Sequence, residues 1–102
     1  RMVESAIALM RKHIEDPLPL PLVARRLGVS LRELEARFAA ELGAGPKGVY
    51  RSLRLSAARR YVEQSSYPVS EIALRCGYRN ASAMTRAFNA EFGVTPRDLR
   101  KG

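Results

Sequence analysis

One stretch of this 102-residue sequence decides its fold: residues 72–100 read IALRCGYRNASAMTRAFNAEFGVTPRDLR. Its short apolar opening is expected to be helical and to stop at Gly77, because glycine readily adopts the left-handed conformation that ends helices. Asn80 is a good N-cap for a longer helix over residues 81–92, which Gly93 and a following proline terminate. The stretch therefore predicts a short helix, a tight turn, a longer helix and a firm stop.

The same order of residues occurs once before in the chain. Positions in the short helix and turn recur at an offset of 49, and positions in the longer helix and its stop recur at an offset of 50. The first copy holds Val23, Ala24, Gly28, Ser30, Leu34, Phe38, Glu41, Gly43 and Pro46, and the second holds Ile72, Ala73, Gly77, Asn80, Met84, Phe88, Glu91, Gly93 and Pro96. This succession is typical of a helix-turn-helix unit. The repeat therefore predicts two such units in one chain.

Apolar spacing and capping residues in the remaining sequence predict an all-α fold with seven helices and no strand. The expected helices cover residues 3–15, 21–27, 31–42, 47–65, 69–76, 81–92 and 97–101. We interpret residues 1–102 as a single domain in three parts. These are a first helix-turn-helix subdomain, a connecting helix and a second helix-turn-helix subdomain, at residues 1–46, 47–65 and 66–102.

The charge balance indicates an anionic partner. Eighteen Lys and Arg residues against ten Asp and Glu give a net charge of +8, and the pI of about 10.6 lies in the range typical of nucleic-acid-binding domains. Fifteen of the basic residues are Arg, which favours bidentate recognition of phosphate or guanine. A nucleic acid is therefore the first expectation, with an acidic protein as a rival.

Several function classes find no support in the residues present. The only histidine, His13, has no nucleophile or second histidine spaced to form a catalytic pair, and no Gly-rich phosphate loop occurs. The single cysteine, Cys76, suits a small core residue better than a metal site. No apolar run approaches membrane length, and no signal peptide is recognisable. We therefore expect no enzyme, cofactor, metal or membrane contact, and a cytoplasmic location.

Several stretches of the sequence resemble those of a known protein family. The stretches I-A-L-R-C-G-Y, S-A-M-T-R-A-F and F-G-V-T-P-R-D-L-R within 72–100 resemble the signature of the C-terminal DNA-binding domain of AraC-type (AraC/XylS) transcription regulators. R-L-S-A-A-R-R at 54–60 resembles its counterpart in that family, whereas Tyr78 and Met84 stand where such sequences usually have Phe. The chain looks closest to the subgroup with an N-terminal amidotransferase-like domain.

This resemblance implies a homeodomain-like fold, a function and partners for the chain. It implies sequence-specific binding of double-stranded DNA as the DNA-binding domain of a bacterial transcription regulator, reading two adjacent major-groove segments. RNA polymerase is an expected partner at promoters, and an effector-binding domain is expected outside this fragment. The alternative is a basic helical module that binds RNA or an acidic protein.

In helix-turn-helix proteins the outer face of the second helix enters the major groove. On the helix over 31–42, a buried stripe of Leu31, Leu34, Phe38 and Leu42 leaves an opposite face of Arg32, Glu35, Ala36 and Ala39. Arg32 is expected to contact a base or phosphate, with a solvated charge as the alternative. Glu35 either accepts a hydrogen bond from a cytosine amino group or pairs with Arg32.

The offset of 50 transfers this reading face to the helix over 81–92. There it consists of Ser82, Thr85, Arg86 and Asn89, while Met84, Phe88 and Phe92 take the buried stripe. Arg86 is suited to bidentate contact with guanine. The second unit therefore offers more side chains able to bond base edges than the first.

Phosphate contacts are expected beside both reading faces. The residues assigned to them are Ser30, Lys47, Arg51 and Asn80. Further basic residues of the connecting helix, Arg54, Arg59 and Arg60, touch phosphates or only solvate the surface, and Arg54 has a structural role as a third alternative. Arg97, Arg100 and Lys101 extend the phosphate contact or carry no specific role.

Overall fold

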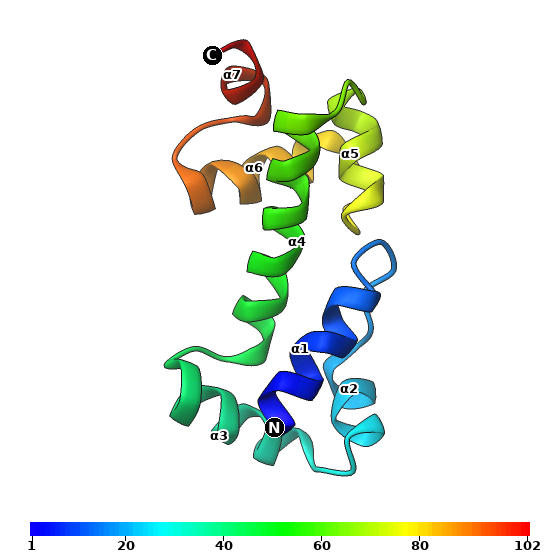
Figure 1. Ribbon diagram of the computed structural model, residues 1–102, viewed down its shortest axis with the longest axis vertical. Coiled ribbons are helices and arrows are strands. Elements are labelled where there is room, and N and C mark those ends of the chain that lie inside the picture. Colours follow the sequence, from blue (N-terminus) through cyan, green and yellow to red (C-terminus); the bar gives the residue numbers. More distant parts are fainter. The chain divides into compact units, whose positions relative to one another are not determined.

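The computed structural model describes residues 1–102 and contains only α-helices and connecting loops (Figure 1). The seven helices are α1 (Met2–Lys12), α2 (Leu20–Arg26), α3 (Leu31–Leu42), α4 (Pro46–Gln64), α5 (Val69–Arg75), α6 (Ala81–Phe92) and α7 (Pro96–Lys101). The expected all-α class, the number of helices and the absence of strands are confirmed. The bounds of α3 and α6 agree with the expected ones at both ends.

The chain divides into two compact units, each with its own buried core. The first unit holds residues 1–13 and 17–53, and the second holds residues 14–16 and 54–102. The first core consists of Val3, Ala6, Met10, Val23, Ala24, Leu34, Phe38 and Tyr50, and the second consists of Leu55, Ala57, Ala58, Val62, Ile72, Ala73, Cys76, Met84 and Phe88. The start of α4 belongs to the first unit and its end to the second.

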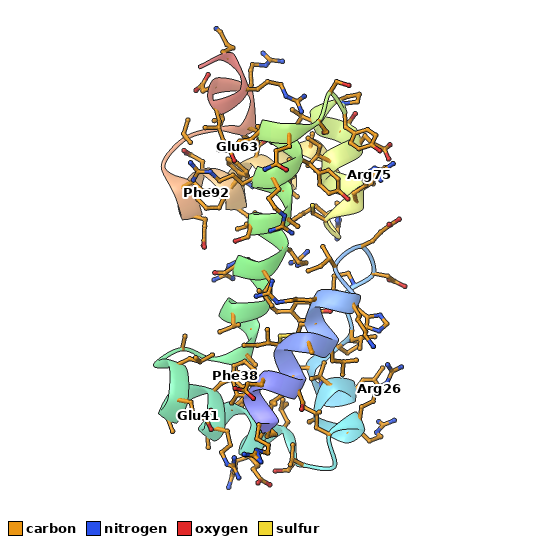
Figure 2. The ribbon with its side chains drawn as sticks, viewed as in Figure 1. Arg26, Phe38, Glu41, Glu63, Arg75 and Phe92 are labelled. Atoms are coloured by element: carbon orange, nitrogen blue, oxygen red, sulfur yellow. The ribbon has the colours of Figure 1, made fainter.

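The repeated sequence positions occupy equivalent places in the two cores. Phe38 of α3 and Phe88 of α6 are both fully buried, and Figure 2 shows Phe38 within the first unit. Two further pairs, Val23 with Ile72 and Leu34 with Met84, are also fully buried. Burying a side chain of this size removes it from water and contributes roughly 1.5–3 kcal/mol. The repeat therefore marks the residues that pack each short helix against the longer helix that follows it.

Each helix-turn-helix has the same turn, closed by the same two backbone hydrogen bonds. In the first unit the amides of Gly28 and Val29 donate to the carbonyls of Arg25 and Ala24. In the second unit the amides at Gly77 and the next residue make the corresponding bonds to the end of α5. This pair of bonds is a Schellman motif, which requires a left-handed residue at the glycine. Gly28 and Gly77 have φ of 74° and 82°, which accounts for glycine at both turns.

The expected first helix, residues 3–15, is too long at its C-terminal end. The structure ends α1 at Lys12, and His13 leaves the helical conformation with φ −127° and ψ 57°. The Tyr50 hydroxyl donates to the His13 carbonyl at 2.6 Å and accepts from the Leu18 amide at 3.0 Å. Ile14, which lies within the expected range of this helix, is outside α1 and packs against the second core. The helix therefore ends where Tyr50, a residue distant in sequence, bonds to the chain.

The expected buried stripe of α3 is also partly wrong. Leu34 and Phe38 are fully buried, but Leu31 is half-buried and Leu42 is 47% exposed. Leu42 lies in the last turn of α3, beyond the residues that the first core covers. Its counterpart Phe92 is only partly buried, and it packs edge-on against Phe88 at 4.7 Å between ring centroids.

Phe92 is also covered by a charged side chain of α4. The Arg59 guanidinium lies over the Phe92 ring, 4.8 Å from its centroid, and also donates to the Glu63 carboxylate at 3.3 Å. Figure 2 shows Phe92 and Glu63 near each other in the second unit. Such a stacked cation stabilises an aromatic ring that stays in contact with water. The last turn of α6 is therefore better covered than that of α3.

Candidate nucleic-acid interface

The α6 helix presents a polar face whose start is fixed by a side-chain cap. The Asn80 carbonyl oxygen accepts from the Ala83 amide at 2.8 Å, which satisfies one of the free amides of the first turn. Ser82, Arg86 and Asn89 are exposed on this helix. Arg86 forms no hydrogen bond or ion pair within the protein. The side chains expected to read bases are therefore brought together on one helix, with the guanidinium unengaged.

Thr85 is the least accessible of the four residues expected on this face. It is half-buried and lines a hollow of about 340 Å³ beside the start of α7. The other lining residues are Val69, Ala81, Thr95, Pro96 and Arg97. Thr95 uses its hydroxyl to cap α7, where it accepts from the Asp98 amide at 3.1 Å. The hollow thus places a second hydroxyl and an exposed guanidinium close to Thr85.

The α3 helix has the same design with a different set of charges. The Ser30 hydroxyl accepts from the Glu33 amide at 3.0 Å and caps the helix. Arg32, Glu35 and Ala36 are all exposed, as expected. The ion pair between Arg32 and Glu35, one of the two alternatives considered for Glu35, does not form. Both side chains stay in solvent.

Two residues expected to contact phosphate lie at the start of α4. Lys47 and Arg51 are exposed and one helical turn apart, and neither bonds to another residue. The caps Ser30 and Asn80 each use an oxygen within the protein, so the Ser30 hydroxyl hydrogen and the Asn80 amide hydrogens keep their donor capacity. All four assigned residues therefore retain a group that can bond to a phosphate.

Two other arginines, Arg54 and Arg100, donate hydrogen bonds to backbone carbonyls of the protein itself. The Arg54 guanidinium donates to the carbonyls of Gly77 at 2.9 Å and Cys76 at 3.3 Å, and lies 4.3 Å from the centroid of the Tyr78 ring. Arg100 donates to carbonyl oxygens around the end of α4. Arg54 therefore has the structural role considered for it, and Arg100 has one as well.

Cys76 is buried, and the structure places no metal-ligating group around it. No cluster of three His, Cys, Asp or Glu side chains occurs. Burial raises the pKa of the Cys76 thiol to about 11, against the opposing influence of Arg54 and Arg60. The thiol is therefore neutral at physiological pH and is a packing group. None of the helices is both long and apolar enough to cross a bilayer.

Comparison with known proteins identifies the family. The family model described as "Helix-turn-helix domain" matches residues 23–102. The HTH-type transcriptional regulator GbdR of Pseudomonas aeruginosa is 34% identical over 100 residues, which cover 98% of this chain and 27% of GbdR. This chain therefore spans only about a quarter of the length of that relative.

Solved structures agree with this over nearly the whole chain. An AraC-type DNA-binding-domain regulator from Chromobacterium violaceum superposes with a TM-score of 0.94 at 35% identity, covering 98% of this chain and 89% of that one. The DNA-binding domain of AdpA, a global transcriptional factor crystallised with a target DNA, gives a TM-score of 0.90 at 28% identity, covering 97% and 89% of the two chains. The chain belongs to the AraC-type family of helix-turn-helix domains.

Proposed function

We propose that residues 1–102 act as one sequence-specific DNA-binding domain of a bacterial transcription regulator, with α3 and α6 each reading a segment of the major groove. Within it, residues 1–46 and 66–102 are the two reading subdomains and residues 47–65 connect them. The observation that carries this proposal is the pair of capped helices, each packed by a repeated core and each with an exposed polar face. The DNA complex of the similar AdpA domain supports it.

On α6, the side chains match the donor and acceptor pattern of purines in the major groove. Arg86 is assigned to bidentate contact with guanine, and Asn89 to bidentate contact with adenine, since these are the pairings that their geometry favours. Ser82 and Thr85 add hydroxyls that bond to bases or to the nearby backbone. The half-site of α6 is therefore expected to be the more sharply defined of the two.

On α3, the reading face combines one cation, one anion and small residues. Arg32 is assigned to guanine or to a phosphate, and the absence of an Arg32–Glu35 pair leaves the Glu35 carboxylate available to accept from a cytosine amino group. Ala36 allows close approach and apolar contact with a thymine methyl group. Ser30, Lys47, Arg51 and Asn80 are assigned to phosphates, which position the domain without reading sequence.

The rest of the regulator is proposed from the family. Relatives such as GbdR are several times longer than this chain, which supports an effector-binding domain outside these residues, with the amidotransferase-like type as the expected one. RNA polymerase is proposed as the partner at promoters and the cytoplasm as the compartment. No catalytic activity is proposed for residues 1–102, since their relatives are named as transcription regulators.

Random-site selection with residues 1–102 tests this function. We expect an enriched duplex with two conserved segments. The Arg86→Ala variant should then bind the selected duplex about 10- to 100-fold more weakly, the cost of one bidentate base contact, with little loss on random DNA. Arg11→Ala, which removes an exposed arginine from α1, is the matched control.

Two outcomes would contradict these assignments. Equal losses on selected and random DNA would make Arg86 a phosphate contact. Selection of no sequence at all, with binding that still weakens with salt, would favour the module that binds RNA or an acidic protein. The polar and charged composition of both exposed faces argues against that module, because a protein interface core usually holds aromatic and aliphatic anchors.

A further inference from the structure

The two units are equivalent over more of the chain than the helix-turn-helix repeat covers. The first helix of the second unit is the end of α4, and it matches α1 at an offset of 52. At this offset both helices end together, at Lys12 and Gln64. All three buried residues of α1, Val3, Ala6 and Met10, correspond to buried residues of α4, namely Leu55, Ala58 and Val62. Each unit is therefore a helix, a loop and a helix-turn-helix, followed by a further helix.

That following helix carries one residue that bonds back to the loop. In the first unit this residue is Tyr50 of α4, whose hydroxyl donates to the His13 carbonyl at 2.6 Å and accepts from the Leu18 amide at 3.0 Å. His13 is the first residue after α1, and Leu18 lies two positions before α2. Tyr50 itself is only 5% exposed. It thus ties the end of α1 to the entry of the helix-turn-helix.

In the second unit the residue at the equivalent position, offset by 50, is Arg100 of α7. It donates to the Ser65 carbonyl at 3.0 Å and to the Tyr67 carbonyl at 2.6 Å. Ser65 is the first residue after α4, and Tyr67 lies two positions before α5. Two longer bonds of 3.3 Å reach the carbonyls of Val62 and Tyr61. Arg100 therefore makes the same connection as Tyr50, at the same two places of its own unit.

The chemical difference between the two residues follows from the loops. The first loop, residues 13–19, offers Tyr50 one carbonyl and one amide, and a phenol hydroxyl can donate to the first and accept from the second. The second loop, residues 65–68, is shorter and offers only carbonyls. A guanidinium has five donors and no acceptor, which suits that set. The same function is therefore performed by different side chains.

We propose that Tyr50 and Arg100 are positioning residues, each of which fixes the helix-turn-helix of its own unit and thereby the recognition helix that reads one half-site. This rests on the proposed DNA-binding function. All bonds of Tyr50 lie within the first unit and all bonds of Arg100 within the second. The loss of either residue is therefore expected to affect one half-site only.

Amide hydrogen exchange tests the positioning role without DNA. In Arg100→Ala, we expect exchange to become about tenfold faster in residues 65–92, the effect of losing charge-assisted hydrogen bonds, while residues 20–42 keep their protection. Tyr50→Phe removes only a hydroxyl. It should speed exchange in residues 20–42, while residues 65–92 keep their protection. Lys101→Ala, which removes the neighbouring exposed charge, should change neither. Equal changes in both units for either variant would overturn the proposal.

Binding to the selected duplex tests the consequence for reading. Two derivative duplexes are needed, one with the α3 half-site scrambled and one with the α6 half-site scrambled. Arg100→Ala should lose about tenfold in affinity where the α6 half-site is intact and almost nothing where that half-site is scrambled. Tyr50→Phe should lose affinity where the α3 half-site is intact and almost nothing where that half-site is scrambled. Arg100→Lys keeps the charge but not the fork of donors, so it should resemble Arg100→Ala.

Loss by Arg100→Ala on every duplex alike, with full rescue by Arg100→Lys, would make Arg100 a phosphate contact and overturn the proposal. Failure of the underlying function is distinguishable. If the unaltered domain selects no sequence, DNA reading is wrong for the chain, and the exchange pattern alone then decides whether Tyr50 and Arg100 hold their units.

Discussion

Arginine side chains fall into two groups in this protein according to the atoms they meet. Arg54 and Arg100 direct their guanidinium groups to backbone carbonyls, where the positive charge compensates free acceptors at helix ends. Arg32 and Arg86 lie on exposed helical faces and bond to nothing within the protein. Net charge alone therefore overstates the number of arginines that DNA can use.

Arg54 is expected to stabilise the second unit rather than to bind DNA. Arg54→Met keeps the aliphatic stem but removes the two hydrogen bonds to the α5–α6 turn and the contact with Tyr78. We expect the free energy of unfolding to fall by about 1.5–3 kcal/mol, the range for hydrogen bonds to charged groups. Urea denaturation measures this. Arg51→Met, one turn earlier and without partners, should change stability by no more than about 0.5 kcal/mol.

One result would contradict the structural role of Arg54. If Arg54→Met leaves the unfolding midpoint unchanged and weakens binding to all DNA sequences, Arg54 is a phosphate contact. The inward bonds would then not survive in solution.

Cys76 gives a prediction for pH. Its folded pKa of about 11 lies above the ordinary value of 9.0, so the unfolded chain loses the thiol proton first. The contribution of this thiol to stability is complete below pH 9 and falls as the pH rises from 9 toward 11. Comparing the unfolding free energies of the native chain and Cys76→Ala across this range isolates the effect. A difference that stays constant with pH would show that the thiol is not held neutral.

Among the elements, the two Schellman turns give the most direct test of backbone conformation. A side chain added at Gly28 would meet no atom within 4 Å, yet its φ of +74° is one that L-residues avoid. Gly28→Ala should therefore destabilise the first unit by roughly 1–2 kcal/mol through backbone strain alone.

Gly48→Ala is the control, and we expect it to change stability in the opposite direction. It lies inside α4 with ordinary helical geometry, and an added Cβ would approach only the flexible end of Arg51, at 3.9 Å. Gly48→Ala should stabilise the chain by about 0.5–1 kcal/mol, because alanine loses less backbone freedom in a helix. Thermal unfolding of the two variants compares them. Shifts of the same sign would mean that φ at Gly28 is not the controlling factor.

Helices with local start and stop signals could be predicted from the sequence, and those ended by distant partners could not. The bounds of α3 and α6 follow from Ser30 and Asn80 as caps and from the glycines that end them. The early end of α1 coincides with a hydrogen bond from Tyr50, which lies 37 residues from His13. No local pattern carries that information.

The candidate site could likewise be predicted from the sequence only in part. The exposed faces of α3 and α6 follow from helical periodicity, so Arg32 and Arg86 were predicted at exposed positions and are found there. The pair of Tyr50 and Arg100 lies at the offset of 50 that the repeat already uses, but a phenol and a guanidinium are chemically unlike, so the sequence alone does not mark them as equivalent. The likeness of α1 to the end of α4 was missed because the offset between the units changes from 52 to 49 across loops of different length. A search at each offset separately, guided by the buried positions, would have aligned the first helices of the two units.

For the molecule as a whole, two separate cores predict two separable unfolding events. Phe38→Ala leaves a cavity in the first core, and Phe88→Ala leaves the equivalent cavity in the second, each at a cost of roughly 3–5 kcal/mol. We expect amide protection to fall mainly in the unit that carries the substitution, since each phenylalanine belongs to one cluster. Residue-resolved hydrogen exchange is the measurement. Loss of protection in both units by the same factor would indicate a single cooperative core.

The shared helix α4 has a consequence for protein design. Its start corresponds to α7 and its end corresponds to α1, so one continuous helix closes the first unit and opens the second. Repeat arrays grow in this manner, each module supplying the surface on which the next one builds. Replacing Gly102 by the sequence of residues 52–64, followed by a further copy of residues 65–102, would therefore continue α7 in register and add a third reading module. Such a tandem protein would lengthen the recognised DNA sequence by one segment.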